Sequence, residues 1–256
     1  MRTADMPLIR RSRLLGHVPE PELLGMLTTC FVQSLPKGTA LCRQAERPEF
    51  LHIVLDGTIG LFGEGPRGEQ LIEFFGPGDS FILPAVMLDV PYLMTAKLLT
   101  QARILLWPAA SFRAEVRKSG PLAYGAALLL SSYWRSLIGQ IKDLKLLSAT
   151  ERLSAFLLAL APRQDGPVTI PLPGGHRLIA GRLGITPQSL SRALAVLRPL
   201  GVSSGRREIR VDAPARLREF AAVQQLGAPR RMAETRRRAD HSGSARAKAT
   251  RYQSET

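Results

Sequence analysis

Three polar side chains lie close together in the segment ITPQSLSRAL, and their types suit hydrogen bonding to planar groups. If the segment is helical, Gln188, Ser191 and Arg192 stand at positions i, i+3 and i+4 and share one face. An arginine can donate two parallel hydrogen bonds to the O6 and N7 atoms of guanine, and a glutamine can pair with adenine. Serine is short enough to touch a base or a phosphate. We therefore predict DNA base contacts from these three residues.

The residues around this polar face predict the helix that would position it. Thr186 can act as N-cap, with its hydroxyl accepting an otherwise unpaired backbone N–H group. Pro187 follows at the first helical position, where its missing N–H costs nothing. The apolar side of the helix is predicted from residues that recur at helical spacing: Leu190, Ala193, Leu194 and Leu197. The sequence thus predicts a helix over 187–197 with one buried and one polar side.

A second helix and a basic hairpin are predicted on either side of this one. A helix over 176–183, a turn at 184–185 and the helix over 187–197 together form a helix-turn-helix, whose second helix would enter the major groove. The segment that follows predicts a turn, a hairpin with arginines around its tip, and a closing helix. Phosphate contacts are predicted for six residues: His176, Arg177, Thr186, Arg206, Arg207 and Arg210.

The distribution of charge supports a polyanionic partner. The net charge is +14, and residues 1–165 contribute only +3 of it, from 18 Lys and Arg against 15 Asp and Glu. Residues 166–226 contribute +6 and residues 227–256 contribute +5. Such an excess favours nucleic acid as the partner, with a merely solvated surface as the alternative.

The first half of the chain predicts an antiparallel sheet followed by a long helix. Short apolar or alternating segments separated by glycine turns run from about Leu35 to Leu106, with no strand–helix–strand alternation. A long helix then begins near Pro121. Apolar residues alternate along it at spacings of four and three, which favours a dimer seam over a helix packed only on its own barrel. After Ala123 and Ala127, the seam residues are Leu130, Trp134, Leu137, Ile141 and Leu144.

These patterns predict an α+β fold in four parts. Residues 1–120 form an antiparallel barrel or jelly roll. Residues 121–147 form a dimerisation helix, and residues 148–226 form a winged helix-turn-helix domain that binds DNA. Residues 227–256 are polar and basic and are expected to be a disordered tail.

Several other classes of protein are disfavoured. No apolar run approaches the length of a membrane span, and the N-terminus has no signal-peptide pattern, so we expect a cytoplasmic protein without a membrane partner. No catalytic triad, phosphate loop or metal-ligand spacing supports an enzyme. The two cysteines, Cys30 and Cys42, cannot by themselves form a four-thiolate iron–sulfur site.

From about Pro19 to Phe220 the chain resembles bacterial transcription regulators of the Crp/Fnr family. The similarity rests on KGTALCRQAERPEFLHIVLDGTIGLF, on GPGDSF, on the long helix and on IAGRLGITPQSLSRALAVLRPLGV. The resemblance implies that residues 1–120 form an effector-sensing β-roll of the cyclic-nucleotide-binding-like type. It also implies a homodimer on a two-fold symmetric DNA operator, with RNA polymerase as a further partner if the protein activates transcription. Where the family commonly has a glutamate in its recognition helix, this chain has Gln188, while Ser191 and Arg192 fit the family pattern.

The resemblance also bears on the effector. The positions that would hold the glutamate and arginine of cyclic-nucleotide members carry Pro84 and Met94, so no cyclic AMP binding is expected, and no iron–sulfur cluster is expected either. The apolar segment is similar to that of Dnr-type members, which respond to nitric oxide through haem, and the candidate haem ligands are His17, His52 and Cys42. A different small ligand, a cyclic-nucleotide-type binding module, and a regulator controlled only by its abundance are the alternatives. The expected effector pocket, which could equally be a filled core, consists of Pro84, Val86, Met87, Leu88, Tyr92, Met94 and Thr95.

Overall fold

The computed structural model describes residues 5–65, 68–161, 166–172 and 175–224. The described residues up to Arg218 form one compact unit, and a second unit begins at Glu219. The tail predicted at 227–256 lies outside the described residues. Among the helices of the described ranges, none is both long enough and apolar enough to cross a membrane.

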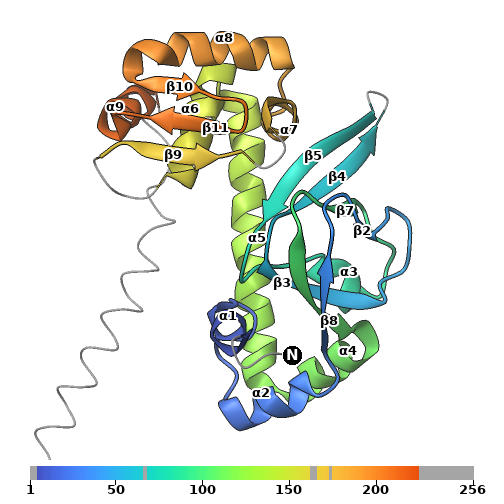
Figure 1. The fold of residues 1–256 in the computed structure, drawn as a ribbon. Helices are drawn as coiled ribbons and strands as arrows, with labels where there is room; N and C mark the ends of the chain where they lie inside the picture. The colour runs from blue at the N-terminus through green and yellow to red at the C-terminus, as the bar shows by residue number, and fades with distance from the viewer. Residues whose placement is uncertain (1–4, 66–67, 162–165, 173–174, 225–256) are drawn as a thin grey trace, which may run out of the picture. The chain divides into compact units, whose positions relative to one another are not determined.

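Two four-stranded antiparallel sheets form the N-terminal part, which confirms the predicted roll (Figure 1). The first sheet has the order β1-β8-β3-β6, with β1 (Phe31–Leu35), β8 (Ala102–Pro108), β3 (Phe50–Asp56) and β6 (Ser80–Phe81). The second sheet has the order β2-β7-β4-β5, with β2 (Ala40–Cys42), β7 (Thr95–Leu98), β4 (Ile59–Gly65) and β5 (Gly68–Phe75). All strand pairs in both sheets are antiparallel.

Strand β3 explains why the roll has a core on both sides of its first sheet. Five consecutive residues of this strand are buried, and successive side chains of a strand point to opposite faces. Leu51 and Ile53 pack into a core with the helices, whereas Val54 packs with Phe81 in a second core. The segment FLHIVL is therefore apolar at nearly every position, and not only at alternate positions, because both faces of the strand are covered.

Short helices cover the side of the first sheet on which Leu51 and Ile53 lie. Helix α2 (Glu20–Leu27) precedes the first strand, and α4 (Ala109–Lys118) follows the last strand. Two shorter helices, α1 (Met6–Arg11) and α3 (Leu83–Leu88), were not predicted. Each has only six residues, which is too few for a helical period to show in the sequence.

The long helix α5 (Gly120–Leu146) packs one of its faces on the roll. Ser119 caps it by accepting a hydrogen bond from the backbone N–H of Leu122 at 3.1 Å. Gly125 allows the N-terminal segment to cross the helix closely, because a Cβ atom there would lie 2.1 Å from the carbonyl oxygen of Leu14. Leu122, Ala126 and Leu129 are buried on the same face.

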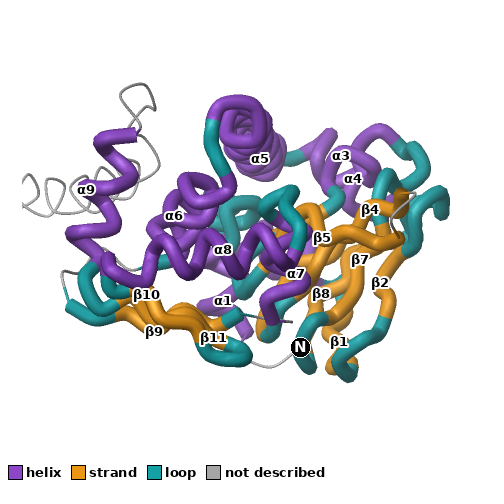
Figure 2. The backbone as a smooth tube through the Cα atoms, turned by 90° about the horizontal axis from the view of Figure 1, so that it is seen from above, coloured by secondary structure: helices purple, strands orange, loops and turns teal. Residues whose placement is uncertain are grey.

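The C-terminal part begins with a capped helix and contains the expected helices and hairpin. Ser148 and Glu151 form a capping box at the start of α6 (Ala149–Leu160). Helix α6 packs alongside α8 (Figure 2). A small antiparallel sheet of order β10-β11-β9 completes this part. Its elements are β9 (Val168–Pro171), α7 (Gly175–Arg182), α8 (Pro187–Leu197), the 3-10 turn η2 (Arg198–Leu200), β10 (Val202–Ser204), β11 (Glu208–Val211) and α9 (Pro214–Gln224).

Candidate nucleic-acid interface

Helix α8 begins and buries its apolar side as the sequence predicts. The Thr186 hydroxyl accepts a hydrogen bond from the backbone N–H of Ser189 at 3.1 Å, and Pro187 is the first helical residue. Leu190, Ala193 and Leu197 are buried, and Leu194, also predicted for this side, is half-buried. The N-cap and the apolar stripe together fix which face of α8 remains free.

The free face of α8 carries the three residues predicted to read bases. Gln188, Ser191 and Arg192 are all exposed. The guanidinium of Arg192 donates a hydrogen bond from Nη2 to Oγ of Ser189 at 3.2 Å, and this hydroxyl also lies 3.0 Å from that of Thr186. The structure therefore presents the three side chains together, with Arg192 steadied by Ser189. The role of Ser189 was not predicted, because a spacing of three residues in a helix is common between exposed side chains and does not by itself indicate a hydrogen bond.

The turn between α7 and α8 has a geometry that requires glycine. The backbone N–H of Ile185 donates to the carbonyl of Ala180 at 2.9 Å, and that of Gly184 donates to the carbonyl of Gly181 at 2.9 Å, which is the Schellman pattern. Gly184 has φ of 64°, a left-handed conformation that side chains disfavour. A Cβ atom at Gly184 would also lie 2.8 Å from Cδ2 of Leu144 on α5. The left-handed backbone is thus the main reason for glycine here, because the Leu144 methyl group belongs to a flexible side chain that can shift.

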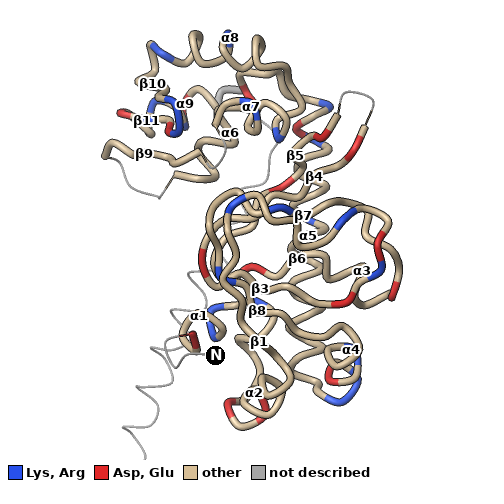
Figure 3. The backbone as a smooth tube through the Cα atoms, turned by 45° about the vertical axis from the view of Figure 1, so that its right-hand side comes forward, with Lys and Arg blue, Asp and Glu red and all other residues tan. Residues whose placement is uncertain are grey.

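The hairpin of β10 and β11 places arginines around its tip. Arg206 and Arg207 are exposed in the turn, and Arg210 is exposed on β11, where its Nε lies 2.5 Å from Oδ1 of Asp212. Figure 3 shows lysine and arginine positions along α8 and in this hairpin. Three guanidinium groups at the edge of the helix-turn-helix suit contacts with phosphates, although Arg210 would have to exchange its partner.

The remaining predicted phosphate contacts lie at the start of α7. Arg177 is exposed there, and His176 is half-buried with no hydrogen-bond partner for Nε2 within the described part of the chain. The Thr186 hydroxyl accepts from the backbone N–H of Ser189 and donates to Oγ of Ser189 at 3.0 Å, so the O–H group that a phosphate would need is already in use.

The comparisons with known proteins follow the same division of the chain. Residues 32–119 match the cyclic nucleotide-binding domain, and residues 151–220 match the Crp-like helix-turn-helix domain. A proposed cyclic nucleotide binding protein from Ruegeria pomeroyi DSS-3 is 30% identical over 86% of this chain and 97% of its own, with a TM-score of 0.63. The chain belongs to the Crp/Fnr family. It is therefore a DNA-binding transcription regulator of the Crp/Fnr type.

Two further solved structures are similar to this Crp/Fnr regulator. A proposed cAMP-binding regulatory protein from Silicibacter pomeroyi DSS-3 is 29% identical over 86% of this chain and 99% of its own, with a TM-score of 0.62. FixK2 from Bradyrhizobium japonicum is 23% identical over 74% of this chain and 96% of its own, with a TM-score of 0.66, and it shows the shared fold. A search of the curated proteins gives no match.

The segment predicted to form the effector pocket is dispersed in the structure. Val86 is buried in the core beside the helices, whereas Pro84 and Leu88 are exposed. Met87 and Met94 are half-buried against two different cores, and the Thr95 hydroxyl accepts a hydrogen bond from the backbone N–H of Gln44 at 3.0 Å. Of the seven residues, Tyr92 lines a sizeable pocket in the roll.

The three candidate haem ligands are also divided. His17 packs edge-on against Tyr124, with ring centroids 5.3 Å apart. Cys42 and His52, in contrast, line the same pocket as Tyr92. Among the described residues, no group of three or more His, Cys, Asp or Glu side chains is placed to hold a metal ion.

A carboxylate that joins three elements was not predicted from the sequence. Glu73 on β5 accepts two hydrogen bonds from Arg182 on α7, at 3.0 and 2.8 Å, and a third from Gln140 on α5 at 2.7 Å. No local pattern signals such a contact, because the three residues lie far apart in the chain.

Proposed function

We propose that this Crp/Fnr regulator acts as a homodimer that binds a two-fold symmetric DNA site, under the control of an effector in the β-roll. The observation that carries the proposal is an apolar stripe on α5 that one copy of the chain leaves uncovered. It accompanies a recognition helix whose base-reading face is free.

The stripe contains four of the five residues predicted for the seam, whereas the fifth, Leu130, is half-buried against the core of its own chain. Trp134 is 66% exposed, and Leu137, Ile141 and Leu144 are each about half exposed. The residues of α5 that are buried against the roll, Leu122, Gly125, Ala126 and Leu129, all lie in the first half of the helix. A contiguous apolar surface of this kind on a regular heptad spacing marks an interface, and a second copy of the same helix offers a matching surface.

A dimer of this kind would present two recognition helices to DNA. In two-fold symmetric helix-turn-helix proteins the two half-sites lie about one helical turn, roughly 34 Å, apart. An effector that binds one arrangement of the dimer better than another would shift the population toward it and so change DNA affinity. A role in activation through RNA polymerase and a cytoplasmic location remain predictions.

A haem effector does not fit the residues that the roll provides. Cys42 and His52 lie in a pocket whose lining also includes Glu46 and Glu49, with Arg47 as its single cationic side chain. A haem carries two propionate carboxylates, which would meet two carboxylates of the same charge there. His52 also stacks on Phe81, with ring centroids 5.3 Å apart. We therefore propose a different class of effector below.

The dimer is tested by placing a charge on the stripe. Leu137→Glu should convert the protein to a monomer and abolish tight binding to a symmetric DNA probe, whereas Leu146→Glu should change neither property. Leu146 is an ideal control because it is an exposed leucine of the same helix, 68% exposed, that lies off the stripe. Light scattering coupled to size exclusion gives the mass, and fluorescence anisotropy gives the DNA affinity. A monomeric wild type, or a Leu137→Glu variant that remains a dimer, contradicts the proposal.

A further inference from the structure

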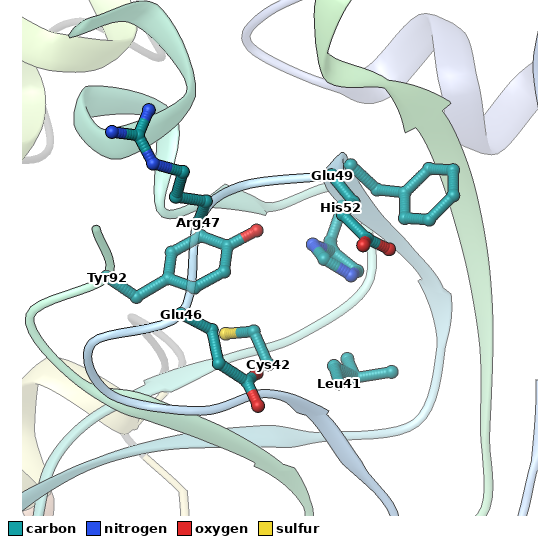
Figure 4. Close-up of a pocket in the computed structure, with 8 residues that line it drawn as sticks. Leu41, Cys42, Glu46, Arg47, Glu49, His52 and Tyr92 are labelled. Carbon is teal, nitrogen blue, oxygen red and sulfur yellow. The ribbon is translucent and has the colours of Figure 1, made fainter. Parts of the chain in front are cut away.

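The β-roll contains a pocket of about 510 Å³ that the sequence did not predict as a whole. Its walls come from β2, the loop 43–49, β3 and the segment after α3. The residues that line it are Leu41, Cys42, Glu46, Arg47, Glu49, Phe50, His52 and Tyr92. Figure 4 shows how these side chains surround one space.

The inner side chains of the pocket are polar but uncharged at neutral pH. Burial lowers the pKa of His52 to about 4, raises the pKa of Cys42 to about 11 and raises the pKa of Tyr92. An imidazole, a thiol and a phenol therefore offer hydrogen-bonding atoms without a positive charge. A buried anionic group such as a phosphate would find no cation among them.

His52 has a hydrogen-bonding atom that the protein itself does not use. Its side chain is 2% exposed, and Nδ1 has no partner within the described residues. Buried polar atoms are nearly always paired, so an unpaired one beside a pocket points to a ligand or an ordered water molecule. Because the imidazole is neutral and stacks on Phe81, its orientation is fixed and Nδ1 can accept a hydrogen bond.

The carboxylates of Glu46 and Glu49, which both line the pocket, differ in whether the protein already pairs them. Glu46 already accepts a hydrogen bond from the backbone N–H of Arg43 at 2.8 Å, and it lies 4.0 Å from the guanidinium of that residue. For the Glu49 carboxylate, no hydrogen bond or ion pair occurs within the described ranges. In Figure 4 the Glu49 carboxylate lies near the imidazole of His52, while the Arg47 guanidinium points away from both. Glu49 is thus the negative charge that a ligand can reach.

The loop that forms the wall is held in an unusual conformation. Ala45 has φ of 69°, which places a non-glycine residue in the left-handed region. Its backbone N–H donates to the carbonyl of Tyr92 at 2.8 Å, and the N–H of Tyr92 donates to the carbonyl of Glu46 at 2.9 Å. These two bonds clamp the loop to Tyr92 and keep the pocket formed. Strained residues held in this way are concentrated at ligand sites.

We propose that this pocket binds a compact organic cation, a primary ammonium group on an aromatic body, as the effector. The ammonium donates hydrogen bonds to the Glu49 carboxylate and to the neutral imidazole of His52, and the aromatic body packs against Tyr92 and Phe50. The set of acceptors favours a donor-rich cation, and the rim carboxylates repel anions. A metal ion is a poorer occupant because the described residues offer no cluster of ligands for it. The inference deepens the proposed function and rests on it only for the effect of the ligand on DNA.

Three small molecules with one ring and different charges test the pocket on the full-length wild type. Tyramine is cationic, 4-ethylphenol is neutral, and 3-(4-hydroxyphenyl)propionate is anionic. Titration calorimetry without DNA should show binding of tyramine, binding of 4-ethylphenol at least about fivefold weaker, and no measurable binding of the propionate. Equal or tighter binding of the propionate, or no binding of tyramine at millimolar concentration, overturns the proposal.

A matched pair of variants assigns the binding to the pocket. Glu49→Gln should weaken tyramine about five- to tenfold and leave 4-ethylphenol unchanged, because only the charge is lost. Glu64→Gln, an exposed glutamate of β4 outside the pocket, should bind tyramine as the wild type does. Unchanged tyramine affinity in Glu49→Gln overturns the assignment, and the three-probe series on the wild type still decides the matter if that variant fails to fold.

DNA binding is measured separately on the same protein. A change in affinity for a symmetric probe on saturation with tyramine supports the effector role, and an unchanged affinity overturns that role. A wild type that binds tyramine but binds no DNA in either state contradicts the proposed function and leaves the ligand site standing.

Discussion

Replacement of Arg192 by alanine removes the side chain with the greatest capacity to specify a base. Arg192 is exposed, and its Nη2 donates a hydrogen bond to the hydroxyl oxygen of Ser189 at 3.2 Å. The buried stripe of α8 and the Thr186 cap do not involve its guanidinium, so Arg192→Ala should fold as the wild type does. Its effect should therefore fall on DNA binding.

The magnitude follows from the contact that is lost. A bidentate contact between arginine and guanine contributes about 1–3 kcal/mol of discrimination, or about five- to 150-fold in affinity per half-site. In a dimer both half-sites lose the contact, which doubles the free-energy change if the two are independent. We expect a loss of about 2–6 kcal/mol on the preferred symmetric site and a much smaller loss on unrelated DNA.

The assay begins with selection of the preferred site from random DNA by the wild type. Fluorescence anisotropy then compares the wild type, Arg192→Ala and Arg198→Ala on that site and on a scrambled one. Arg198 is an exposed arginine that follows directly at the end of α8, so its loss tests the effect of charge without base reading. Equal losses for Arg192→Ala on the two DNAs would refute direct readout by this residue.

Four further outcomes are expected. Thr186→Ala should lower the free energy of unfolding by about 1 kcal/mol in urea titrations, because the cap on the Ser189 N–H is lost, while Thr186→Ser should retain most of it. His52 has a folded pKa of about 4, below its unfolded value of 6.5, so its contribution is complete above about pH 6.5 and is lost as the pH falls toward 4. His52→Phe should remove about 3 kcal/mol of this acid sensitivity relative to the wild type, and parallel stability–pH curves for the two proteins would show the reasoning to be wrong. Protein expressed with a supply of haem should show no stoichiometric Soret band, and a band that shifts with nitric oxide would overturn our rejection of haem. A chain ending at Leu226, which lacks 8 of the Lys and Arg residues, should show a shallower dependence of DNA affinity on salt, and an unchanged slope would mean that the removed segment does not contact phosphates.

The parts of this protein that could be predicted are those in which local spacing determines structure. The Thr-Pro start of α8 and the heptads of α5 each act within a few residues, and both segments are helical as expected. The pocket was missed because its lining comes from β2, a loop, β3 and Tyr92, which only the sheet topology brings together. The segment after the sixth strand looked like a pocket because it is apolar, but the short helix α3 sends Val86 into the core and leaves Leu88 71% exposed.

The hydroxyl groups at the start of α8 have an entropic effect on recognition. A free arginine side chain samples many rotamers, and ordering it on DNA costs about 0.5–1.5 kcal/mol. The Ser189 hydroxyl accepts from Arg192 and is itself held near the Thr186 hydroxyl that caps the helix, so part of that ordering is complete before DNA arrives. Thr186 therefore also restricts, through Ser189, the conformations of the Arg192 guanidinium that contacts the base. A substitution of Thr186 would therefore change the rate of DNA binding and the base specificity as well as the stability of the fold.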